Sequence, residues 1–164
     1  GKDGLKFLEI GCFECMATRW LLENVLIGGS GITVIDTFEG SIEHKQAGIE
    51  IGGLPRFKEN IAEFKDKVII KQGYSQDILK KLPVNKYDFI YVDGSHHAKD
   101  ALQDIILSWS LLKTGGIMIM DDYAWNGFSD NLNACIAMDA FLNCYLGDYE
   151  LLLKEYQIVV RKIK

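Results

Sequence analysis

Long apolar runs are absent from this sequence: none reaches the ~18 residues that a membrane-spanning helix requires, and no secretion signal is visible. Cysteine is scarce, with four among 164 residues, and nothing in their placement suggests the disulfide framework of a secreted protein. Internal repeats and low-complexity segments are also absent. We therefore expect one domain, residues 1–164, without a membrane partner and in a reducing compartment, the cytoplasm.

The sequence also lacks an excess of positive charge. It has 18 Lys and Arg residues against 23 Asp and Glu residues, which gives a net charge of −5, and the basic residues are dispersed. A nucleic-acid surface normally shows a basic cluster, so we do not expect nucleic acid as a partner. An acidic protein fits a cationic cofactor or a metal ion at least as well.

Short apolar runs and amphipathic segments alternate along the chain, and their periodicities predict strands and helices. Strands are predicted at residues 5–10, 32–35, 68–71, 87–92 and 117–120. Helices are predicted at residues 17–26, 57–64, 76–82, 98–112 and 131–145. We expect Gly28 and Gly29 to end the first helix, Ser95 to cap the fourth, and residues 114–116 to turn the chain into the fifth strand.

Two further β-rich runs lie close together at residues 150–154 and 157–161, and they can pair as an antiparallel hairpin. Strands that alternate with helices imply a parallel sheet with right-handed crossovers. The predicted fold class is therefore α/β, with a Rossmann-like, doubly wound, mostly parallel sheet of seven strands that ends in an antiparallel hairpin.

Ligands of an open α/β sheet bind beyond the carboxyl ends of its strands, so the residues that follow each predicted strand are site candidates. The first strand leads through Gly11 into a helix N-terminus, where free N–H groups and a glycine allow a ligand to approach the backbone. Cys12 and Cys15 in this turn form a C-x-x-C pair, which leaves a thiol redox function as an alternative. The turn lacks the G-x-G-x-x-G spacing of nicotinamide enzymes.

Three acids follow the two predicted strands that should be neighbours in the sheet, namely Asp93, Asp121 and Asp122. Neighbouring strand ends lie about 5 Å apart, and three carboxylates that converge there would repel one another without a cation. Oxygen ligands of this kind suit Mg²⁺ or Mn²⁺. His96 lies beside them and is a candidate base, since its ordinary pKa is near neutral; only one of His96 and His97 can point into a given pocket.

Five segments taken together resemble the class I S-adenosylmethionine-dependent methyltransferases, and within them the catechol and macrocin O-methyltransferase types. In chain order they read F-L-E-I-G-C-F-E, V-I-D-T-F, G-Y-S-Q-D-I-L, Y-D-F-I-Y-V-D-G-S-H and G-G-I-M-I-M-D-D-Y. The resemblance covers nearly the whole chain, including the final hairpin. It implies S-adenosylmethionine as the cofactor, a divalent cation such as Mg²⁺, and O-methylation of a small hydroxylated molecule.

The resemblance also implies roles for individual residues. Glu9 and Gly11 would seat the methionine end of the cofactor, and Asp36, after the second strand, would bind the ribose. The complete predicted cofactor set is Glu9, Gly11, Phe13, Asp36, Thr37, Ser75, Gln76 and Asp93, with Ser75 and Gln76 beside the adenine. The predicted metal ligands are Asp93, Asp121 and Asp122, and the predicted catalytic residues are Asp93 and His96, with His96 in place of the lysine base of the catechol type.

One position departs from the family pattern, because Cys15 stands where a further glycine is usual. A non-catalytic cofactor-binding domain therefore remains an alternative. Residues 37–54 and 123–131 are expected to cover the substrate, with Phe38, Trp125 and Phe128 suited to an aromatic or sugar ring and His44 in a substrate lid. An oligomer is compatible with the sequence, which does not set the oligomeric state.

Overall fold

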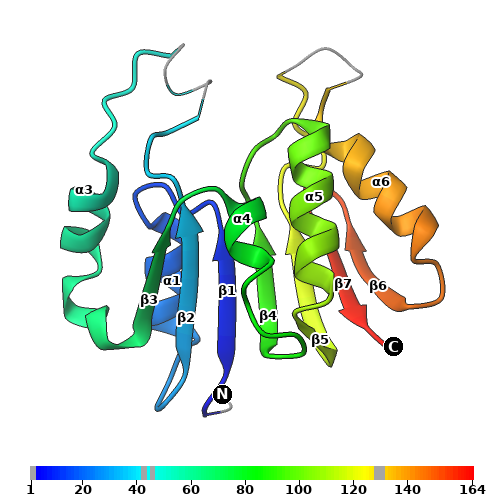
Figure 1. Ribbon diagram of the computed structural model, residues 1–164, viewed down its shortest axis with the longest axis horizontal. Helices are drawn as coiled ribbons and strands as arrows, with labels where there is room; N and C mark the ends of the chain where they lie inside the picture. Colours follow the sequence, from blue (N-terminus) through cyan, green and yellow to red (C-terminus); the bar gives the residue numbers. More distant parts are fainter. Residues whose placement is uncertain (1–2, 42–43, 45–46, 128–131) are drawn as a thin grey trace.

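The computed structural model describes residues 3–41, 44, 47–127 and 132–164. They form a seven-stranded sheet with the order β3-β2-β1-β4-β5-β7-β6 (Figure 1). The strands are β1 (Lys6–Ile10), β2 (Gly31–Asp36), β3 (Val68–Gln72), β4 (Tyr87–Val92), β5 (Leu112–Met120), β6 (Tyr149–Lys154) and β7 (Ile158–Lys162). The first five strands are mutually parallel, whereas β7 is antiparallel to both β5 and β6. The predicted fold class is confirmed.

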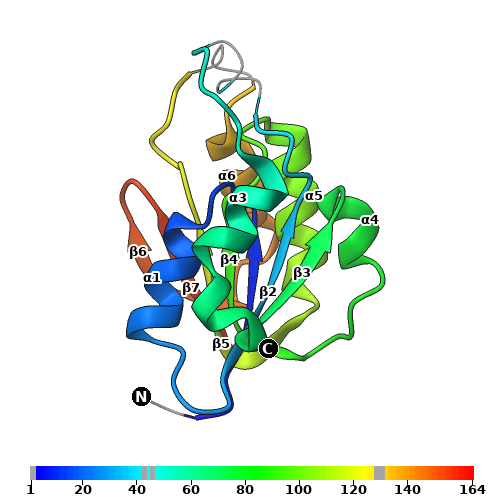
Figure 2. The ribbon, with the colours of Figure 1, turned by 90° about the vertical axis from the view of Figure 1, so that its left-hand side faces the viewer.

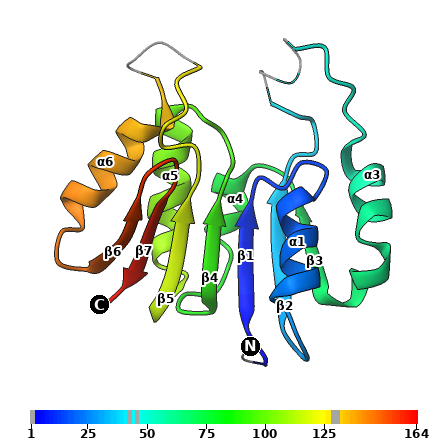
Figure 3. The ribbon, with the colours of Figure 1, turned by 180° about the vertical axis from the view of Figure 1, so that it is seen from behind.

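Helices lie on both faces of this sheet. Figures 2 and 3 show α4 (Ser75–Leu79), α5 (Ala98–Trp109) and α6 (Ala134–Cys144) on one face, and α1 (Met16–Asn24) on the other, over β1 and β2. The remaining helices, α3 (Gly53–Asn60) and the 3-10 helix η1 (Ala62–Lys67), lead into β3. Among the described residues no helix combines the length and the apolarity needed to cross a bilayer.

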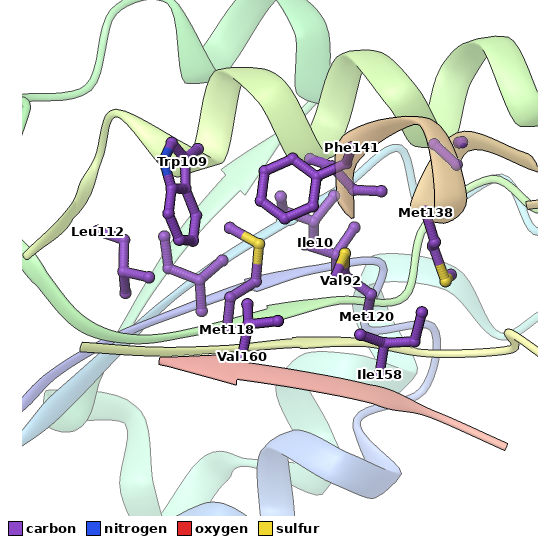
Figure 4. Packing of buried hydrophobic residues seen from close by; sticks show 14 of the residues in the cluster. Ile10, Val92, Trp109, Leu112, Met118, Met120, Met138, Phe141, Ile158 and Val160 are labelled. Carbon is purple, nitrogen blue, oxygen red and sulfur yellow. The ribbon is translucent and has the colours of Figure 1, made fainter. Parts of the chain in front are cut away.

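The larger of the two apolar clusters that the described residues form fills the space between the sheet and helices α5 and α6 (Figure 4). Met118 and Met120 of β5 are fully buried there, and the Phe141 ring packs edge-on against Trp109 with 5.1 Å between ring centroids. Burial of each such side chain stabilises the fold by roughly 1.5–3 kcal/mol. The second cluster joins α1 and α3 to β1 and β2 through Leu22 and Phe57. Both clusters hold the strands in place beneath the site.

The sheet reverses its winding direction between β1 and β4, which are neighbours although they are far apart in the sequence. The Asp93 N–H donates to the Ile10 carbonyl at 2.8 Å, and the Gly11 N–H donates to the Ile35 carbonyl at 2.9 Å. The carboxyl ends of β2, β1 and β4 are therefore tied side by side. Ligands bind at this kind of switch point in open α/β sheets.

Several predicted boundaries were wrong. Helix α1 ends at Asn24, before the predicted last residue Leu26 and the predicted stop at Gly28 and Gly29. The N–H groups of both Val25 and Leu26 bond the Leu21 carbonyl, and Leu26 then enters the core. The cap residue of α5 is His97 and not Ser95, whose hydroxyl instead donates to the Asp100 carboxylate at 3.1 Å.

Two further elements differ from their predicted boundaries: one strand is longer, and one predicted helix is divided in two. Strand β5 begins at Leu112, so the predicted turn at residues 114–116 lies inside it, where its register against β4 shifts and Gly115 has a φ of 81°. A glycine within a strand commonly marks such an irregularity. The helix predicted at residues 57–64 starts earlier, at Gly53 with Pro55 in its first turn, and gives way to η1.

Candidate active site

The carboxyl ends of strands β1 to β5 border a cleft of about 1650 Å³. It reaches from the turn after β1, past Asp36 and residues 73–76, to the loops that follow β4 and β5. Most of the predicted site residues line it: Glu9, Gly11, Phe13, Asp36, Thr37, Ser75, Gln76, Asp93, His96 and Asp122. Asp121 is not among the lining residues. Residues from five separate loops thus share one cavity.

The turn after β1 can hold only glycine at position 11. Gly11 has a φ of 77°, and a Cβ there would overlap the backbone carbonyl of Asp93. Phe13 and Cys15 also have positive φ values, 44° and 78°, although neither is a glycine. Such conformations cost an L-residue free energy and cluster at functional sites. Cys15 therefore occupies a glycine-like conformation at the position where the family pattern favours glycine.

Glu9 lies beneath this turn with 1% of its surface exposed. Its Oε2 accepts a hydrogen bond from the Thr18 hydroxyl at 2.6 Å, while Oε1 has no hydrogen-bond partner among the described residues. Burial raises the pKa of Glu9 to about 8. A buried acid with one unsatisfied oxygen on the wall of a cleft is suited to a cationic ligand, because a positive charge would compensate for the lost hydration.

Asp36 joins the ends of β1 and β2. One carboxylate oxygen accepts the N–H groups of Cys12 and Phe13, both at 2.8 Å, and the other accepts the N–H of Phe38 at 2.7 Å. Three of its roughly four acceptor positions are thus used within the protein. Asp36 shapes the turn in this structure, and a ribose would have to share its carboxylate with these amides.

The two cysteines of the turn do not have the environment of a redox pair. Cys12 and Cys15 are both buried, with 5% and 2% of their surfaces exposed. Burial, followed by the neighbouring carboxylates of Asp36 and Glu9, raises the pKa of the Cys12 thiol, and burial likewise raises the pKa of the Cys15 thiol. Reactive thiols need a lowered pKa and access to solvent, so the geometry argues against the redox alternative.

Ser75 and Gln76 are held from behind by Asp104, a residue that the sequence analysis did not single out. Asp104 Oδ1 accepts from the Ser75 hydroxyl at 2.6 Å and from Gln76 Nε2 at 3.0 Å. Asp104 is 1% exposed, and burial raises its pKa to about 7. The sequence did contain a sign of this role, because Asp104 lies three residues after Ala101 and next to Ile105, on the apolar face of α5. A charged group on such a face needs partners.

Asp93, His96 and Asp122 converge at the other end of the cleft. Each offers one ligand atom, and these atoms all lie within 4.8 Å of one another. His96 Nε2 lies 2.8 Å from Asp122 Oδ2, and the other oxygen of Asp122 accepts from the Tyr156 hydroxyl at 2.9 Å. Tyr156 comes from the turn between β6 and β7 and was also missed by the sequence analysis. Asp122 itself has a positive φ of 61°.

Asp121 is placed differently from the other two acids. Its carboxylate accepts hydrogen bonds from the Tyr91 hydroxyl and, at 2.8 Å, from the N–H of Asp122. The structure therefore brings His96, and not Asp121, into the three-residue group with Asp93 and Asp122. Burial, together with the charges of Asp121 and Asp122, raises the pKa of Asp93 to about 8. The hydrogen bond from His96 lowers the pKa of Asp122.

Aromatic side chains flank both ends of the cleft. The Trp125 and His96 rings lie 4.7 Å apart between centroids, and the Phe13 and His44 rings stack at 4.1 Å. Phe38 does not face the substrate space as expected, because it is buried against Phe57 in the core. Phe128, the third expected ring, lies outside the described residues.

Comparisons with known proteins agree with this fold. A curated relative, an uncharacterized protein R132 of Acanthamoeba polyphaga mimivirus, is 25% identical over 130 residues, which cover 74% of this chain and 53% of the relative. The chain thus spans about half the length of that relative.

Solved O-methyltransferase structures share the fold. The enzyme from Bacillus cereus, in complex with SAH, is 20% identical with a TM-score of 0.70, covering 97% of this chain and 74% of the other. TomG from Streptomyces achromogenes, in complex with SAM, is 17% identical with a TM-score of 0.70, covering 97% and 73%. The family model described as a methyltransferase domain matches residues 8–123. This chain therefore belongs to the methyltransferase-domain family.

Proposed function

We propose that this methyltransferase uses S-adenosylmethionine and transfers its methyl group to an oxygen atom of a small hydroxylated molecule. The observation that carries the proposal is the single cleft that joins the Gly11 turn to the group of Asp93, His96 and Asp122. The B. cereus and S. achromogenes enzymes, which share the fold, are described with SAH and SAM respectively. They support the choice of cofactor.

The residues at the Gly11 end of the cleft fit a cofactor that carries positive charge. Burial raises the pKa of Glu9, and that of Asp93 between the Gly11 turn and His96, to about 8, which favours their protonated forms where no positive charge is near. A nearby cation would favour their ionised forms instead. Bound S-adenosylmethionine would supply an electrophilic methyl group on a sulfonium. Asp36, Ser75 and Gln76 lie further along the same cleft, where its adenosine end would extend.

The residues at the other end fit the chemistry of a hydroxyl nucleophile. The carboxylates of Asp93 and Asp122 would hold a divalent cation, which lowers the pKa of a hydroxyl bound to it. Carboxylate oxygens of this kind suit Mn²⁺ as well as Mg²⁺. His96 would accept the hydroxyl proton, with its ring oriented by Asp122 at 2.8 Å.

The reaction is tested by measuring SAH formed from S-adenosylmethionine in the presence of a panel of phenols and sugars, with Mg²⁺, with Mn²⁺ and with a chelator. We expect turnover with at least one hydroxylated compound, stimulated by the cation and lost in Asp93→Asn. Cofactor that binds but is never consumed across the panel would contradict the proposal and favour a non-catalytic binding domain.

The division of roles between Asp93 and His96 is tested by Mn²⁺ binding, followed by electron paramagnetic resonance. We expect Asp93→Asn to lose Mn²⁺ binding and His96→Asn to retain it while losing turnover. Loss of Mn²⁺ binding in His96→Asn would instead make His96 a metal ligand and remove it as the base.

A further inference from the structure

Asp104 is a buried acid that lines the cleft, and the proposed reaction assigns it no role. It projects from α5 toward α4, and both of its hydrogen bonds within the described residues end on Oδ1. The side chain lies so close to the loop after β4 that a Cβ on Gly94 would be 3.0 Å from Oδ2. Ser75, Gln76 and Asp104 all line the cleft.

The carboxylate determines which way its two partners point. A serine hydroxyl has one hydrogen, and Ser75 gives it to Asp104, so the lone pairs of its oxygen can only accept further bonds. Gln76 turns its Nε2 toward Asp104, which places its carbonyl oxygen on the other side of the amide. The Ser75 oxygen is thereby fixed as an acceptor toward a ligand. The Gln76 carbonyl oxygen is turned away from Asp104, where it can accept a second bond from that ligand.

We propose that Asp104 is a positioning residue that makes this part of the cleft select a purine with an exocyclic amino group over one with a keto oxygen. The inference rests on the proposed function, in which the adenosine end of the cofactor lies along Ser75 and Gln76. An amino group donates to the fixed acceptors. A keto oxygen in the place of the amino group would face the Ser75 and Gln76 oxygens, and none of these atoms could donate a hydrogen bond to another. A site built for a hydrogen-bond donor rejects a ligand that lacks this donor.

The test is isothermal titration with S-adenosylhomocysteine and with S-inosylhomocysteine, which differ in having an amino or a keto group on the base. Titrations are run at pH 8.5, because burial raises the pKa of Asp104 to about 7. We expect the wild-type protein to bind the adenosyl compound at least about tenfold more tightly. In Asp104→Asn, which can turn an N–H toward Ser75 and free its hydroxyl, we expect this ratio to approach one.

A purely structural role for Asp104 would weaken both ligands by the same factor and leave their ratio unchanged, which would overturn the inference. Ser75→Ala supplies a second variant in case Asp104→Asn does not fold, and we expect it to lower the ratio in part; an unchanged ratio there would also count against the inference. Asp88→Asn is the matched control, since Asp88 bonds Lys113 and the Lys6 N–H away from the cleft, and its ratio should remain that of the wild type.

The two proposals fail in different ways. Wild-type protein that binds neither compound contradicts the proposed cofactor. Wild-type protein that binds both compounds equally well leaves the cofactor proposal intact and overturns the role of Asp104.

Discussion

Cys15 has a backbone φ of 78° immediately before α1. At a positive φ the usual preference for alanine over glycine is reversed, because a Cβ clashes with the backbone. We expect Cys15→Gly to be more stable than Cys15→Ala by about 1 kcal/mol in urea denaturation. Both variants lose the sulfur, so the comparison isolates the backbone.

The control for this comparison is Ala17, which lies within α1. Ala17→Gly should lower the free energy of unfolding by up to about 1 kcal/mol, because glycine is less favourable than alanine in a right-handed helical conformation. If Cys15→Gly is less stable than Cys15→Ala, the left-handed conformation at this residue is refuted.

Glu9 should make the protein less stable as the pH rises. Its pKa is about 8 in the folded protein against an ordinary 4.5, so between these values the folded state holds a proton that the unfolded state has lost. The free energy of unfolding then falls by up to about 1.4 kcal/mol per pH unit as the pH rises from 4.5 to about 8. The stabilisation that this proton gives the folded state is complete only below pH 4.5. Glu9→Gln should flatten this slope in urea titrations at pH 5, 6, 7 and 8. An equal slope in both proteins would contradict the assignment.

Sequence reasoning located residues that follow a strand directly, such as Gly11, Asp93 and His96, because the carboxyl ends of parallel strands share one edge of the sheet. It missed Asp104 and Tyr156. Both reach the site from elements distant in the sequence, and their importance lies in contacts that no local pattern records. The distinction between Asp121 and Asp122 likewise depends on the direction in which each side chain leaves the strand end.

The loop after β1 and the end of β2 are joined by the hydrogen bonds to Asp36. Asp36→Asn replaces one acceptor oxygen by a donor that faces backbone N–H groups, and unsatisfied buried groups cost about 1–3 kcal/mol each. We expect a loss of about 2 kcal/mol in urea denaturation, together with weaker SAH binding. Asp66→Asn, on the exposed surface of η1, should change neither quantity; equal effects at both positions would rule out this function of Asp36.

The hairpin of β6 and β7 brings the Tyr156 hydroxyl to Asp122. Tyr156→Phe removes a hydrogen bond worth about 1 kcal/mol, so we expect turnover with the best substrate of the panel to fall about fivefold with unchanged SAH affinity. Tyr123→Phe is the control, because the Tyr123 hydroxyl bonds Asp139 instead. A Tyr156→Phe variant with full turnover would show that the hairpin does not serve the site.

Apolar runs identified all seven strands, and β4 was placed with its observed boundaries. The boundaries that were missed depend on tertiary context. Gly115 reads as a turn, yet pairing with β4 keeps it in β5. Gly53 was assigned to the loop of residues 37–54, yet Phe57 packs in the core and the segment from Gly53 onward forms helix α3.

At the scale of the whole molecule, the order of the strands unites the two halves of the site. The placement of β1 next to β4 joins the Gly11 turn to Asp93, and that of β5 next to β4 brings Asp122 to His96. The alternation of strands and helices predicted a doubly wound sheet with β4 and β5 as neighbours, whereas the pairing of β1 with β4 is a finding of the structure. The pairing of β7 with β5 completes the site, because it carries Tyr156 to the same edge.

The central claim is that the cleft beside Gly11 is the seat of S-adenosylmethionine. Isothermal titration of the wild-type protein with S-adenosylhomocysteine tests it most directly. We predict saturable binding of one ligand per chain, displaced competitively by S-adenosylmethionine. The absence of saturable binding up to millimolar ligand, with the protein folded by circular dichroism, would contradict the account.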